Sequence, residues 1–382
     1  MLFVVCAGFA VLALAIHLAS HLLVAWHFWG RGRRAPAQMN MPDVALVRPL
    51  CGVETFSAAT LAASFALTYP RYELIFCVAD ARDPIIPMVE ATMAQHPSVR
   101  ARLLIGEERT SGNPKLDNMA KGFRAASAEI VVFADSNLLV PRDYLQRIMA
   151  TWERDTGAVS APPIGAAPNG AWSEIECSLL NSYAARWQYA VDALGFGFAQ
   201  GKTLAFRRAD LGHGGFQAMG AEPAEDAAAT KWVRARGARV RLVSPPFPQP
   251  IGRRRAREVW ARHLRWARLR RVTFPLLFAP EILTSALLPF GAALLAAMNS
   301  DQSLWEIGAG FALLWYAPEA LLAWRAGWPL SWRTPFACVG RDLLIVALWA
   351  GAWTGRGFVW RGHAMQARHS CADLIKGANH SI

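Results

Sequence analysis

The segment Glu129-Ile130-Val131-Val132-Phe133-Ala134-Asp135 is a short apolar run that ends in a carboxylate. A similar run, Tyr72 to Val78 (YELIFCV), is followed by Ala79 and then Asp80. Continuous apolar runs of this length are typical of strands that are buried on both faces of a parallel sheet. Each run therefore predicts such a strand, with an aspartate just beyond its carboxyl end.

Further strands and helices are expected on either side of these two runs. Residues 44–47 and 101–105 are also short apolar runs. Helix-like stretches lie between and after the strands, around 55–67, 84–95, 115–127 and 142–154. The alternation predicts an α/β domain with a mainly parallel sheet covered by helices. Ligands bind beyond the carboxyl ends of strands in such sheets, so Asp80 and Asp135 lie where a nucleotide is expected. The alternative for either aspartate alone is a helix cap or a turn.

A third acidic point, Glu225-Asp226, precedes a helical stretch that runs to Arg236. Taken alone it is an ordinary acidic first helical turn, which the helix dipole favours. Chemistry that moves a sugar from a nucleotide to a hydroxyl needs a carboxylate to take the hydroxyl proton. It also needs positive charge on the departing diphosphate and a nucleotide pocket. The chain has candidates for all three.

The composition indicates a membrane protein, because 54% of the 382 residues are hydrophobic and 16 are tryptophan. Residues 1–30 are uncharged and long enough to cross about 30 Å of hydrocarbon. An uncleaved anchor is favoured there over a signal peptide, because the start lacks a basic residue. Three more apolar blocks of spanning length follow at 274–298, 304–324 and 336–354.

Basic residues indicate on which side of the membrane the domain between the apolar segments lies. Arginines follow the anchor directly, and the run 252–271 holds nine of them. The positive-inside rule therefore predicts a cytoplasmic domain at 35–271 between the anchor at 1–30 and the membrane helices at 272–355. Four spans would leave the arginines of the tail at 356–382 on the outer face. Arg341-Asp342 favours a re-entrant or interfacial segment in the last block, with a cytoplasmic tail.

The net charge of +12 and the pI near 10.0 have a simpler explanation than binding to nucleic acid. The basic residues concentrate at membrane flanks, which predicts anionic lipid headgroups as partners and no nucleic acid. The six cysteines are scattered without CxxC spacing, which argues against a disulfide framework or a zinc site. The sequence does not indicate an oligomeric state.

Seven short motifs occur in order between about residues 40 and 290. They are Arg48-Pro49-Leu50-Cys51-Gly52-Val53, Tyr69-Pro70-Arg71-Tyr72-Glu73, Cys77-Val78-Ala79-Asp80, Gly112-Asn113-Pro114-Lys115-Leu116-Asp117-Asn118, Ala134-Asp135-Ser136-Asn137, Glu225-Asp226 and Arg262-His263-Leu264-Arg265-Trp266. With these separations the chain resembles the family-2-type glycosyltransferases of the GT-A fold, and specifically the ceramide glucosyltransferases (glycosyltransferase family 21). The versions GNPKLDN and ADSN resemble most the bacterial members of that family.

The resemblance implies a substrate and a role for each matching residue. Asp226 would be the general base, and Asp80 would contact the uracil or ribose end of UDP-glucose. Lys115 and Asn118 would line the nucleotide-sugar pocket. Asp135 would ligate a divalent metal, Mg²⁺ or Mn²⁺, on the diphosphate.

The Arg-x-x-Arg-Trp motif has two interpretations. The resemblance implies that Arg262 and Arg265 place guanidinium groups on the pyrophosphate and that Trp266 places an indole near the acceptor. The alternative is a basic helix that only attracts lipid.

The metal motif departs from the usual Asp-x-Asp, because Asp135-Ser136-Asn137 offers one carboxylate and a neutral amide oxygen. One carboxylate can hold a hard cation together with diphosphate and water, so nucleotide-dependent metal use is expected and tight binding without nucleotide is not.

The resemblance implies one in-line displacement that gives β-glucosylceramide in an integral protein of the bacterial inner membrane, with the catalytic domain in the cytoplasm. Other acceptors, a hopanoid or diacylglycerol, and other donors, UDP-galactose or UDP-N-acetylglucosamine, stay open. A non-catalytic membrane-surface binder is the more distant alternative.

Overall fold

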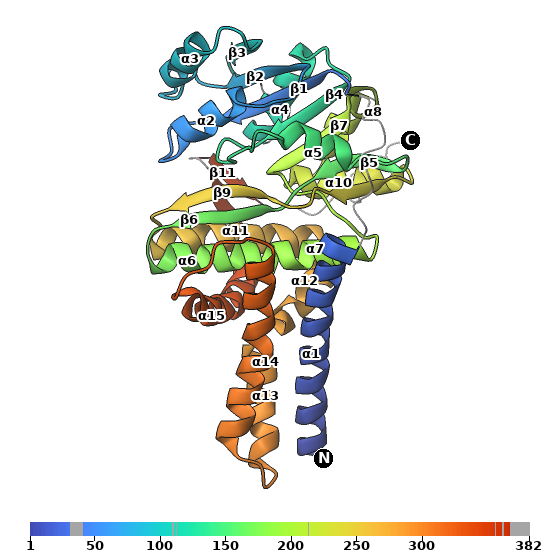
Figure 1. The fold of residues 1–382 in the computed structure, drawn as a ribbon, viewed down its shortest axis with the longest axis vertical. Coiled ribbons are helices and arrows are strands. Elements are labelled where there is room, and N and C mark those ends of the chain that lie inside the picture. The colour runs from blue at the N-terminus through green and yellow to red at the C-terminus, as the bar shows by residue number, and fades with distance from the viewer. Residues whose placement is uncertain are drawn as a thin grey trace, which may run out of the picture. The chain divides into compact units, whose positions relative to one another are not determined.

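The computed structural model describes residues 1–30, 41–108, 111, 113–212, 214–355, 357–360 and 363–366 (Figure 1). The chain divides into two compact units. A helical unit contains Met1–Gly30, Gly165–Ala193 and Ile251–Arg368, and a sheet unit contains Arg31–Ile164, Leu194–Pro250 and His369–Ile382. The arginines that directly follow the anchor and most of the predicted tail at 356–382 lie outside the described residues.

The sheet unit is built on a seven-stranded sheet with the order β3-β2-β1-β4-β7-β5-β8. The strands are β1 (Val44–Leu50), β2 (Tyr72–Val78), β3 (Ala101–Ile105), β4 (Ile130–Ala134), β5 (Thr156–Ser160), β7 (Thr203–Arg207) and β8 (Arg239–Leu242). All neighbouring pairs are parallel except those of β7, which runs antiparallel to β4 and β5. The predicted α/β fold with a mainly parallel sheet is confirmed.

Helices cover both faces of this sheet (Figure 1). On one face Leu46 and Leu74 pack against α2 (Ser57–Phe65), α3 (Ile86–Gln95) and α5 (Tyr144–Ala150). On the other face their neighbours Val47 and Ile75 pack against α4 (Pro114–Ala125), α9 (Gly215–Gly220) and α10 (Glu225–Ala235). Because successive side chains of a strand point to opposite faces, a strand covered on both sides is apolar at most positions. The remaining short helix of the unit is α8 (Arg208–Gly212).

Three helices of the helical unit pack side by side (Figure 1). They are α1 (Leu2–Ala25), which continues as the π-helical turn η1 (Trp26–Gly30), α13 (Leu287–Met298) and α14 (Leu304–Arg325). Within the described residues, three segments are long and apolar enough to cross a membrane, namely Leu2–Gly30, Leu304–Arg325 and Thr334–Trp353. A fourth candidate is the pair Pro275–Thr284 and Leu287–Met298, which is bent by 50°. The four apolar blocks of the sequence therefore all form helical segments.

The remaining helices of this unit are α6 (Ala171–Ser178), η2 (Leu179–Ala185), α7 (Arg186–Ala193), α11 (Ala256–Thr273), α12 (Pro275–Phe278), η3 (Ala279–Thr284) and α15 (Thr334–Trp353). Two pairs of short strands complete the described chain, β6 (Pro163–Pro168) with β9 (Phe247–Gly252) and β10 (Gly357–Trp360) with β11 (His363–Gln366). Helix α15 packs against α6 and α11. Ser331, just before α15, donates a hydrogen bond of 2.9 Å to Glu174 of α6, and Arg271 of α11 donates one of 2.9 Å to the carbonyl of Gly355 after it.

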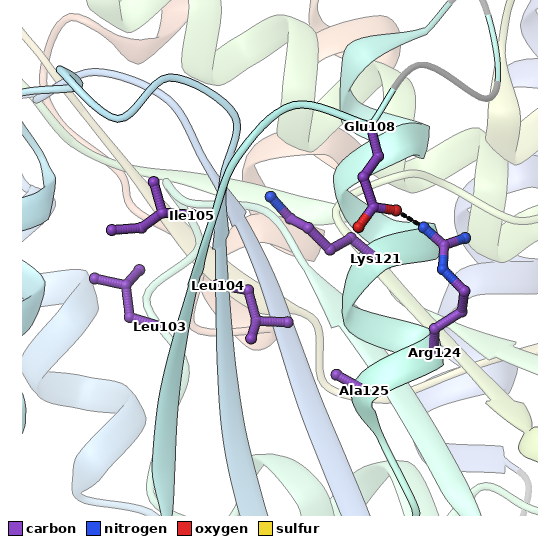
Figure 2. A pocket seen from close by; sticks show the side chains of 7 residues that line it. All are labelled: Leu103, Leu104, Ile105, Glu108, Lys121, Arg124 and Ala125. Carbon is purple, nitrogen blue, oxygen red and sulfur yellow. Dashed lines mark ion pairs between the residues drawn. The ribbon is translucent and has the colours of Figure 1, made fainter.

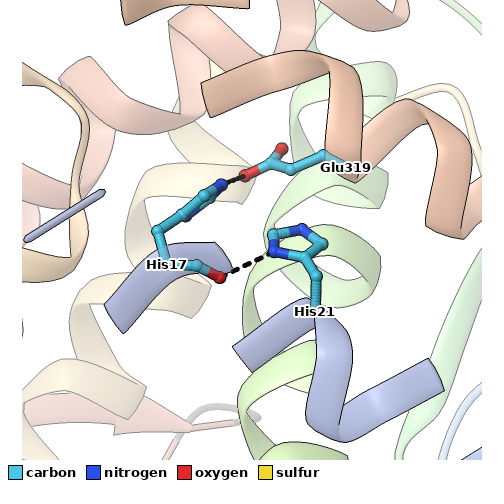
Figure 3. A group of neighbouring side chains, drawn as sticks. All are labelled: His17, His21 and Glu319. Atoms are coloured by element: carbon cyan, nitrogen blue, oxygen red, sulfur yellow. Dashed lines mark hydrogen bonds and ion pairs between the residues drawn. The ribbon is translucent and has the colours of Figure 1, made fainter. Parts of the chain in front are cut away.

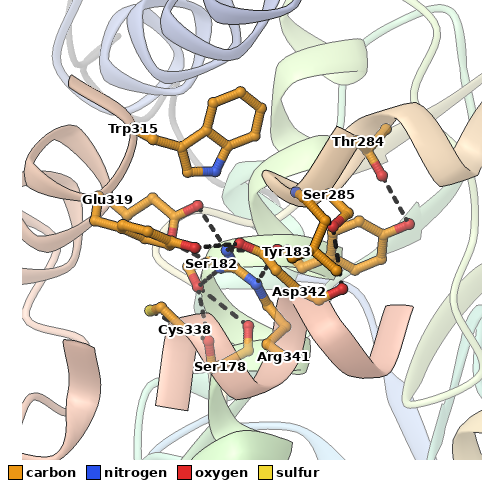
Figure 4. A network of polar contacts seen from close by, with 12 residues as sticks. Ser178, Ser182, Tyr183, Thr284, Ser285, Trp315, Glu319, Cys338, Arg341 and Asp342 are labelled. Atoms are coloured by element: carbon orange, nitrogen blue, oxygen red, sulfur yellow. Dashed lines mark hydrogen bonds and ion pairs between the residues drawn. The ribbon is translucent and has the colours of Figure 1, made fainter. Parts of the chain in front are cut away.

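Arg341 and Asp342, the charged pair inside the last apolar block, are both fully buried and paired (Figure 4). Arg341 binds Glu319 of α14 at 2.7 and 3.1 Å, and it lies 3.0 Å from Asp342. Tyr316 donates a hydrogen bond of 2.8 Å to one oxygen of Asp342. Buried charges persist in apolar surroundings only when they are paired in this way, so the network fixes α15 to α14.

Candidate active site

Asp135 lies directly after β4, and a buried arginine shapes the turn that carries it. The Arg48 side chain in β1 is fully buried and donates to the carbonyls of Asp135, Ser136 and Leu138 at 2.7, 3.1 and 3.0 Å. Its other terminal nitrogen donates to the Thr60 carbonyl at 2.6 Å. The planar guanidinium fork gathers several acceptors at fixed angles, so Arg48 holds the turn in place.

Lys115 brings two of the acidic points together. Asn113 caps α4 by accepting a hydrogen bond of 3.0 Å from the Lys115 backbone N–H, which places this lysine in the first turn of the helix. The Lys115 Nζ lies 2.7 Å from Asp135 Oδ1 and 2.7 Å from Glu225 Oε1. Burial would lower the pKa of Lys115, but the two carboxylates outweigh it and raise the pKa above its usual range. The ammonium group therefore keeps its positive charge throughout the physiological pH range.

A second lysine lies on the other side of Asp135. Lys202 precedes β7, and its Nζ lies 2.7 Å from Asp135 Oδ2 and 3.0 Å from Asn137 Oδ1. Burial alone would raise the pKa of Asp135, but the two ammonium groups hold that pKa well below its usual range. Asp135 is therefore ionised throughout the physiological pH range.

Asp226 opens α10 beside the same cluster. One of its oxygens accepts a hydrogen bond of 2.9 Å from the Gly201 N–H, and the other accepts one of 2.8 Å from the Ala227 N–H. A Cβ added at Gly201 would lie 2.8 Å from Glu225 Oε1 and 2.9 Å from Lys115 Nζ, so a larger residue here would push these two charged ends aside. Burial, and next the charge of Glu225, raise the pKa of Asp226 to about 6. A carboxylate with this pKa is suited to taking up a proton near neutral pH.

Asp80 lies outside this cluster. It follows β2 at the same edge of the sheet, with its side chain 60% exposed and 3.5 Å from Arg82. A hydrogen bond from the Arg82 N–H, more than the Arg82 charge, lowers the pKa of Asp80. Asp83 ties this loop to the one after β1 by accepting from the Gly52 N–H at 2.8 Å. Asn118, the other predicted pocket residue, is buried one turn beyond Lys115 in α4.

The Arg-x-x-Arg-Trp motif lies in α11 of the helical unit. Arg262 forms an ion pair with Glu176 of α6, whose side chain is fully buried, and Arg265 lies one turn further along α11, partly buried. Trp266 packs against Cys177, Leu180 and Ile251. The motif therefore fastens α11 to the α6 segment within this unit.

The oxygens of Asp135 and Asn137 fit a divalent metal, because they converge on one cationic point. The Lys202 ammonium lies at that point, 2.7 and 3.0 Å from them. Carboxylate and amide oxygens are the ligands that Mg²⁺ and Mn²⁺ prefer. Asp135, with Asn137 beside it, is therefore the group that would hold such an ion.

A second group of candidate ligands, His17, His21 and Glu319, lies buried in the helical unit with its ligand atoms within 4.8 Å of one another (Figure 3). His17 Nε2 donates a hydrogen bond of 2.8 Å to the Trp315 backbone carbonyl. Arg341 already binds both oxygens of Glu319, which neutralises that carboxylate. The structure thus favours a packing role for this group over metal binding.

An open hollow on the sheet unit is lined by residues of β3, α4 and the segment between them (Figure 2). The lining residues are Leu103, Leu104, Ile105, Glu108, Lys121, Arg124 and Ala125. It contains no predicted site residue, so the candidate site is defined by the lysine and carboxylate cluster.

Sequence reasoning missed four residues that organise these sites. Lys202 and Gly201 precede β7, a strand that was not predicted. No sequence pattern therefore indicated that they would contact Asp135 and Asp226. Arg48 stands in a quoted motif, but its burial could not be read from a run of apolar residues. Glu176 lies in α6, a helix that the sequence analysis did not identify.

Comparison with known proteins identifies the family. Residues 10–372 match the profile of "Glycosyl transferase family 21". Ceramide glucosyltransferase 1 of Caenorhabditis elegans is 24% identical over 284 residues, which cover 72% of this chain and 61% of the relative. The ceramide glucosyltransferase of Candida albicans is 35% identical over 115 residues, 27% of this chain and 21% of the relative. The chain thus spans less than two thirds of the length of these curated relatives.

A solved structure has the same fold. The mannosyltransferase of Pyrobaculum calidifontis in complex with GDP-Man and Mn²⁺ is 20% identical and superimposes with a TM-score of 0.51. The match covers 91% of this chain and 99% of that one. This likeness supports the predicted GT-A fold.

Proposed function

The chain belongs to glycosyl transferase family 21, and from this premise we propose that it transfers glucose from UDP-glucose to the primary hydroxyl of ceramide. One observation carries the proposal: Asp226, Lys115 and Asp135 converge at the carboxyl edge of the sheet. This cluster combines a carboxylate that titrates near neutral pH with fixed positive charge. The names of the curated relatives supply the sugar and the acceptor.

In the proposed reaction, Asp226 takes the proton of the ceramide hydroxyl as its oxygen attacks the anomeric carbon of UDP-glucose. The bond between that carbon and the diphosphate breaks on the opposite side, and its electron pair leaves with UDP. One displacement inverts the configuration and gives a β-glucoside. The hydrogen bonds from the Gly201 and Ala227 N–H groups orient the carboxylate for this proton transfer.

The negative charge that develops on UDP needs positive partners. Lys115 and Lys202 each place an ammonium group 2.7 Å from Asp135, and these positive charges would stabilise a phosphate group bound beside it. Mg²⁺ or Mn²⁺ bound by Asp135 and Asn137 would add positive charge to the leaving diphosphate.

The other predicted residues have supporting roles in this proposal. Asp80 contacts the uracil or ribose end of the donor, and Asn118 lines the nucleotide-sugar pocket. Arg262 and Arg265 bind the pyrophosphate, and Trp266 lies near the acceptor.

Other lipid acceptors and other UDP-sugars are the nearest alternatives, because acceptor and donor choice depend on pocket shape. A non-catalytic surface binder is the more distant one, and the raised pKa of Asp226, which burial and then Glu225 cause, argues against it. Product analysis is the direct test: membranes that contain the protein are incubated with labelled UDP-glucose and ceramide, and labelled glucosylceramide is the expected product. Absence of transfer and of hydrolysis with every UDP-sugar would instead favour the binder.

We also propose a membrane topology in which α1, the bent pair and α14 span the bilayer. The carboxyl ends of α1 and α14 lie together, because the Arg325 guanidinium is 5.6 Å from the Trp29 ring and Phe28 is 6.3 Å from Trp328. The chain therefore returns after α14 to the side on which α1 ends.

In this topology α15 lies in the interface. It packs against α11, whose arginines are costly at the centre of a bilayer. Phe336, Val339 and Leu343 are exposed on the face of α15 away from Arg341, where lipid would cover them. The predicted tail at 356–382 then lies in the cytoplasm with the domain at 35–271, in agreement with the positive-inside rule.

A reporter fusion tests this topology. Green fluorescent protein fused after Ile382 should fluoresce, and alkaline phosphatase fused there should be inactive, because both ends of α15 lie on the cytoplasmic side. The matched control is phosphatase inserted after Ser300, between α13 and α14, which should be active. An active phosphatase at the carboxyl end would mean that α15 crosses the membrane.

A further inference from the structure

The Lys202 ammonium lies where a metal ion held by the Asp-Ser-Asn motif would lie. Its Nζ is 2.7 Å from Asp135 Oδ2 and 3.0 Å from Asn137 Oδ1, one oxygen from each of the two residues that would hold the ion. The second oxygen of Asp135 contacts Lys115 at 2.7 Å. A divalent ion cannot share these oxygens with an ammonium group, because two cations about 3 Å apart repel strongly in a partly buried site.

The backbone fixes Lys202 beside Asp135, while its side chain has a second possible position. Because β7 pairs antiparallel with β4, the Asp135 N–H donates a hydrogen bond of 3.1 Å to the Lys202 carbonyl. The ammonium group is carried by a flexible four-carbon stem. It can therefore leave the carboxylate for a phosphate oxygen without any change in the sheet.

Charge balance favours this exchange only when nucleotide and metal bind together. The cluster contains two lysines and three carboxylates, Asp135, Glu225 and Asp226, so it carries one net negative charge when all are ionised. A diphosphate diester with charge −2 and a divalent cation together add no net charge. The diphosphate alone would add two negative charges to a cluster that is already negative. The cation alone would reverse the sign of the cluster and place a second cation on Asp135 beside Lys202.

We propose that Lys202 is a built-in competitor of the divalent metal, which moves from Asp135 to the diphosphate when the nucleotide binds. Metal affinity is therefore low without nucleotide and rises with it, and by linkage the metal raises nucleotide affinity by the same factor. This inference rests on the proposed binding of a UDP-sugar at Asp135.

Binding of Mn²⁺, measured on the full chain in detergent by electron paramagnetic resonance with and without UDP, tests this competition. Lys202→Met removes the ammonium group but keeps the stem, so it should bind Mn²⁺ at least tenfold more tightly than the wild type without UDP. The further gain on adding UDP should be at least tenfold smaller in this variant. Lys202→Arg keeps the charge and should behave like the wild type.

The control is Lys231→Met, which removes one positive charge from the same unit, where Lys231 pairs with Glu222 rather than with Asp135. Its Mn²⁺ affinity should equal that of the wild type. Equal Mn²⁺ affinities in the wild type and in Lys202→Met would overturn the competition, as would a gain of the same size in Lys231→Met. Lys202→Gln, which keeps a polar end, repeats the comparison if the methionine variant unfolds.

These measurements need no lipid, so their outcome is separable from that of the proposed reaction. If Mn²⁺ binding behaves as predicted but ceramide is not glucosylated, the proposed acceptor is refuted and Lys202 is still the competitor of the metal. If ceramide is glucosylated but the wild type and Lys202→Met bind Mn²⁺ with equal affinity, the competition is refuted and the proposed acceptor stands.

Discussion

Replacing Asp226 with asparagine should lower kcat for glucosyl transfer by about 10³-fold or more, while UDP still binds. General-base catalysis contributes about 10²–10⁴-fold, and an amide of the same shape cannot accept the hydroxyl proton. The variant keeps an oxygen for the hydrogen bond from the Gly201 N–H and loses the acceptor of the Ala227 N–H, a cost of about 1–3 kcal/mol that should leave the cluster folded. Turnover measured with labelled UDP-glucose, together with UDP binding by calorimetry, checks both parts of this expectation. Retained turnover would remove Asp226 from the mechanism.

The pH dependence of the wild type gives a second view of the same group. Because burial and then Glu225 raise the pKa of Asp226 to about 6, the base is ionised above that pH and protonated below it. The value of kcat/KM should therefore fall on the acid side with a midpoint near pH 6. The matched control is Asp155→Asn, a half-exposed carboxylate paired with Arg241, which should keep both the rate and the midpoint.

Replacing Arg48 with alanine should destabilise the sheet unit by at least about 3 kcal/mol. The change leaves the carbonyls of Asp135, Ser136 and Leu138 without their buried donor, and each such loss costs about 1–3 kcal/mol. For a unit of this size, that loss corresponds to a fall in Tm of roughly 6–12 °C, which thermal unfolding in detergent would detect. Transfer activity at low temperature should fall as well, because the turn that carries Asp135 loses its support.

Arg71→Ala is the control for this second prediction. Arg71 pairs with Asp43 at 2.9 Å, but both side chains are more than half exposed, and surface pairs contribute only about 0–1 kcal/mol. Its Tm should therefore change by less than about 4 °C. Equal losses in the two variants would show that Arg48 is no more important to stability than a surface arginine.

The sequence predicts the first half of the sheet unit well, because β1, β2 and β4 are largely buried and the edge strand β3 is still a continuous apolar run apart from Arg102. The run 72–78 coincides with β2, and 101–105 coincides with β3. The run 44–47 is shorter than β1, which continues to Leu50 through Arg48 and Pro49. The predicted strand ended before Arg48 because arginine is polar. In the structure this side chain is buried, and hydrogen bonds to backbone carbonyls satisfy its donors.

The candidate site was only partly accessible from the sequence. Motif order indicated Asp135, Lys115 and Asp226, and the structure brings these three together. Lys202 reaches Asp135 because an antiparallel strand, β7, returns beside β4, and such a long-range pairing has no local pattern. Asp80 stays outside the cluster, and its predicted contact with the nucleotide remains a prediction.

The helical unit shows why hydropathy alone was ambiguous. The block 336–354 has the length of a span, but Arg341 and Asp342 point into the protein and the helix packs against the arginine-rich α11. Periodicity does not reveal such partners. The bacterial origin and the inner-membrane location remain predictions, since the curated relatives described above are from a nematode and a yeast.

The most direct test of the central claim is the identity of the lipid product. Membranes containing the protein are incubated with labelled UDP-glucose, UDP-galactose or UDP-N-acetylglucosamine, each combined with ceramide, hopanoid or diacylglycerol, and membranes with the Asp226→Asn variant serve as the blank. We expect label only with UDP-glucose and ceramide, in a product that nuclear magnetic resonance identifies as the β-glucoside. Unlabelled ceramide beside a labelled hopanoid or diacylglycerol would contradict the proposed function.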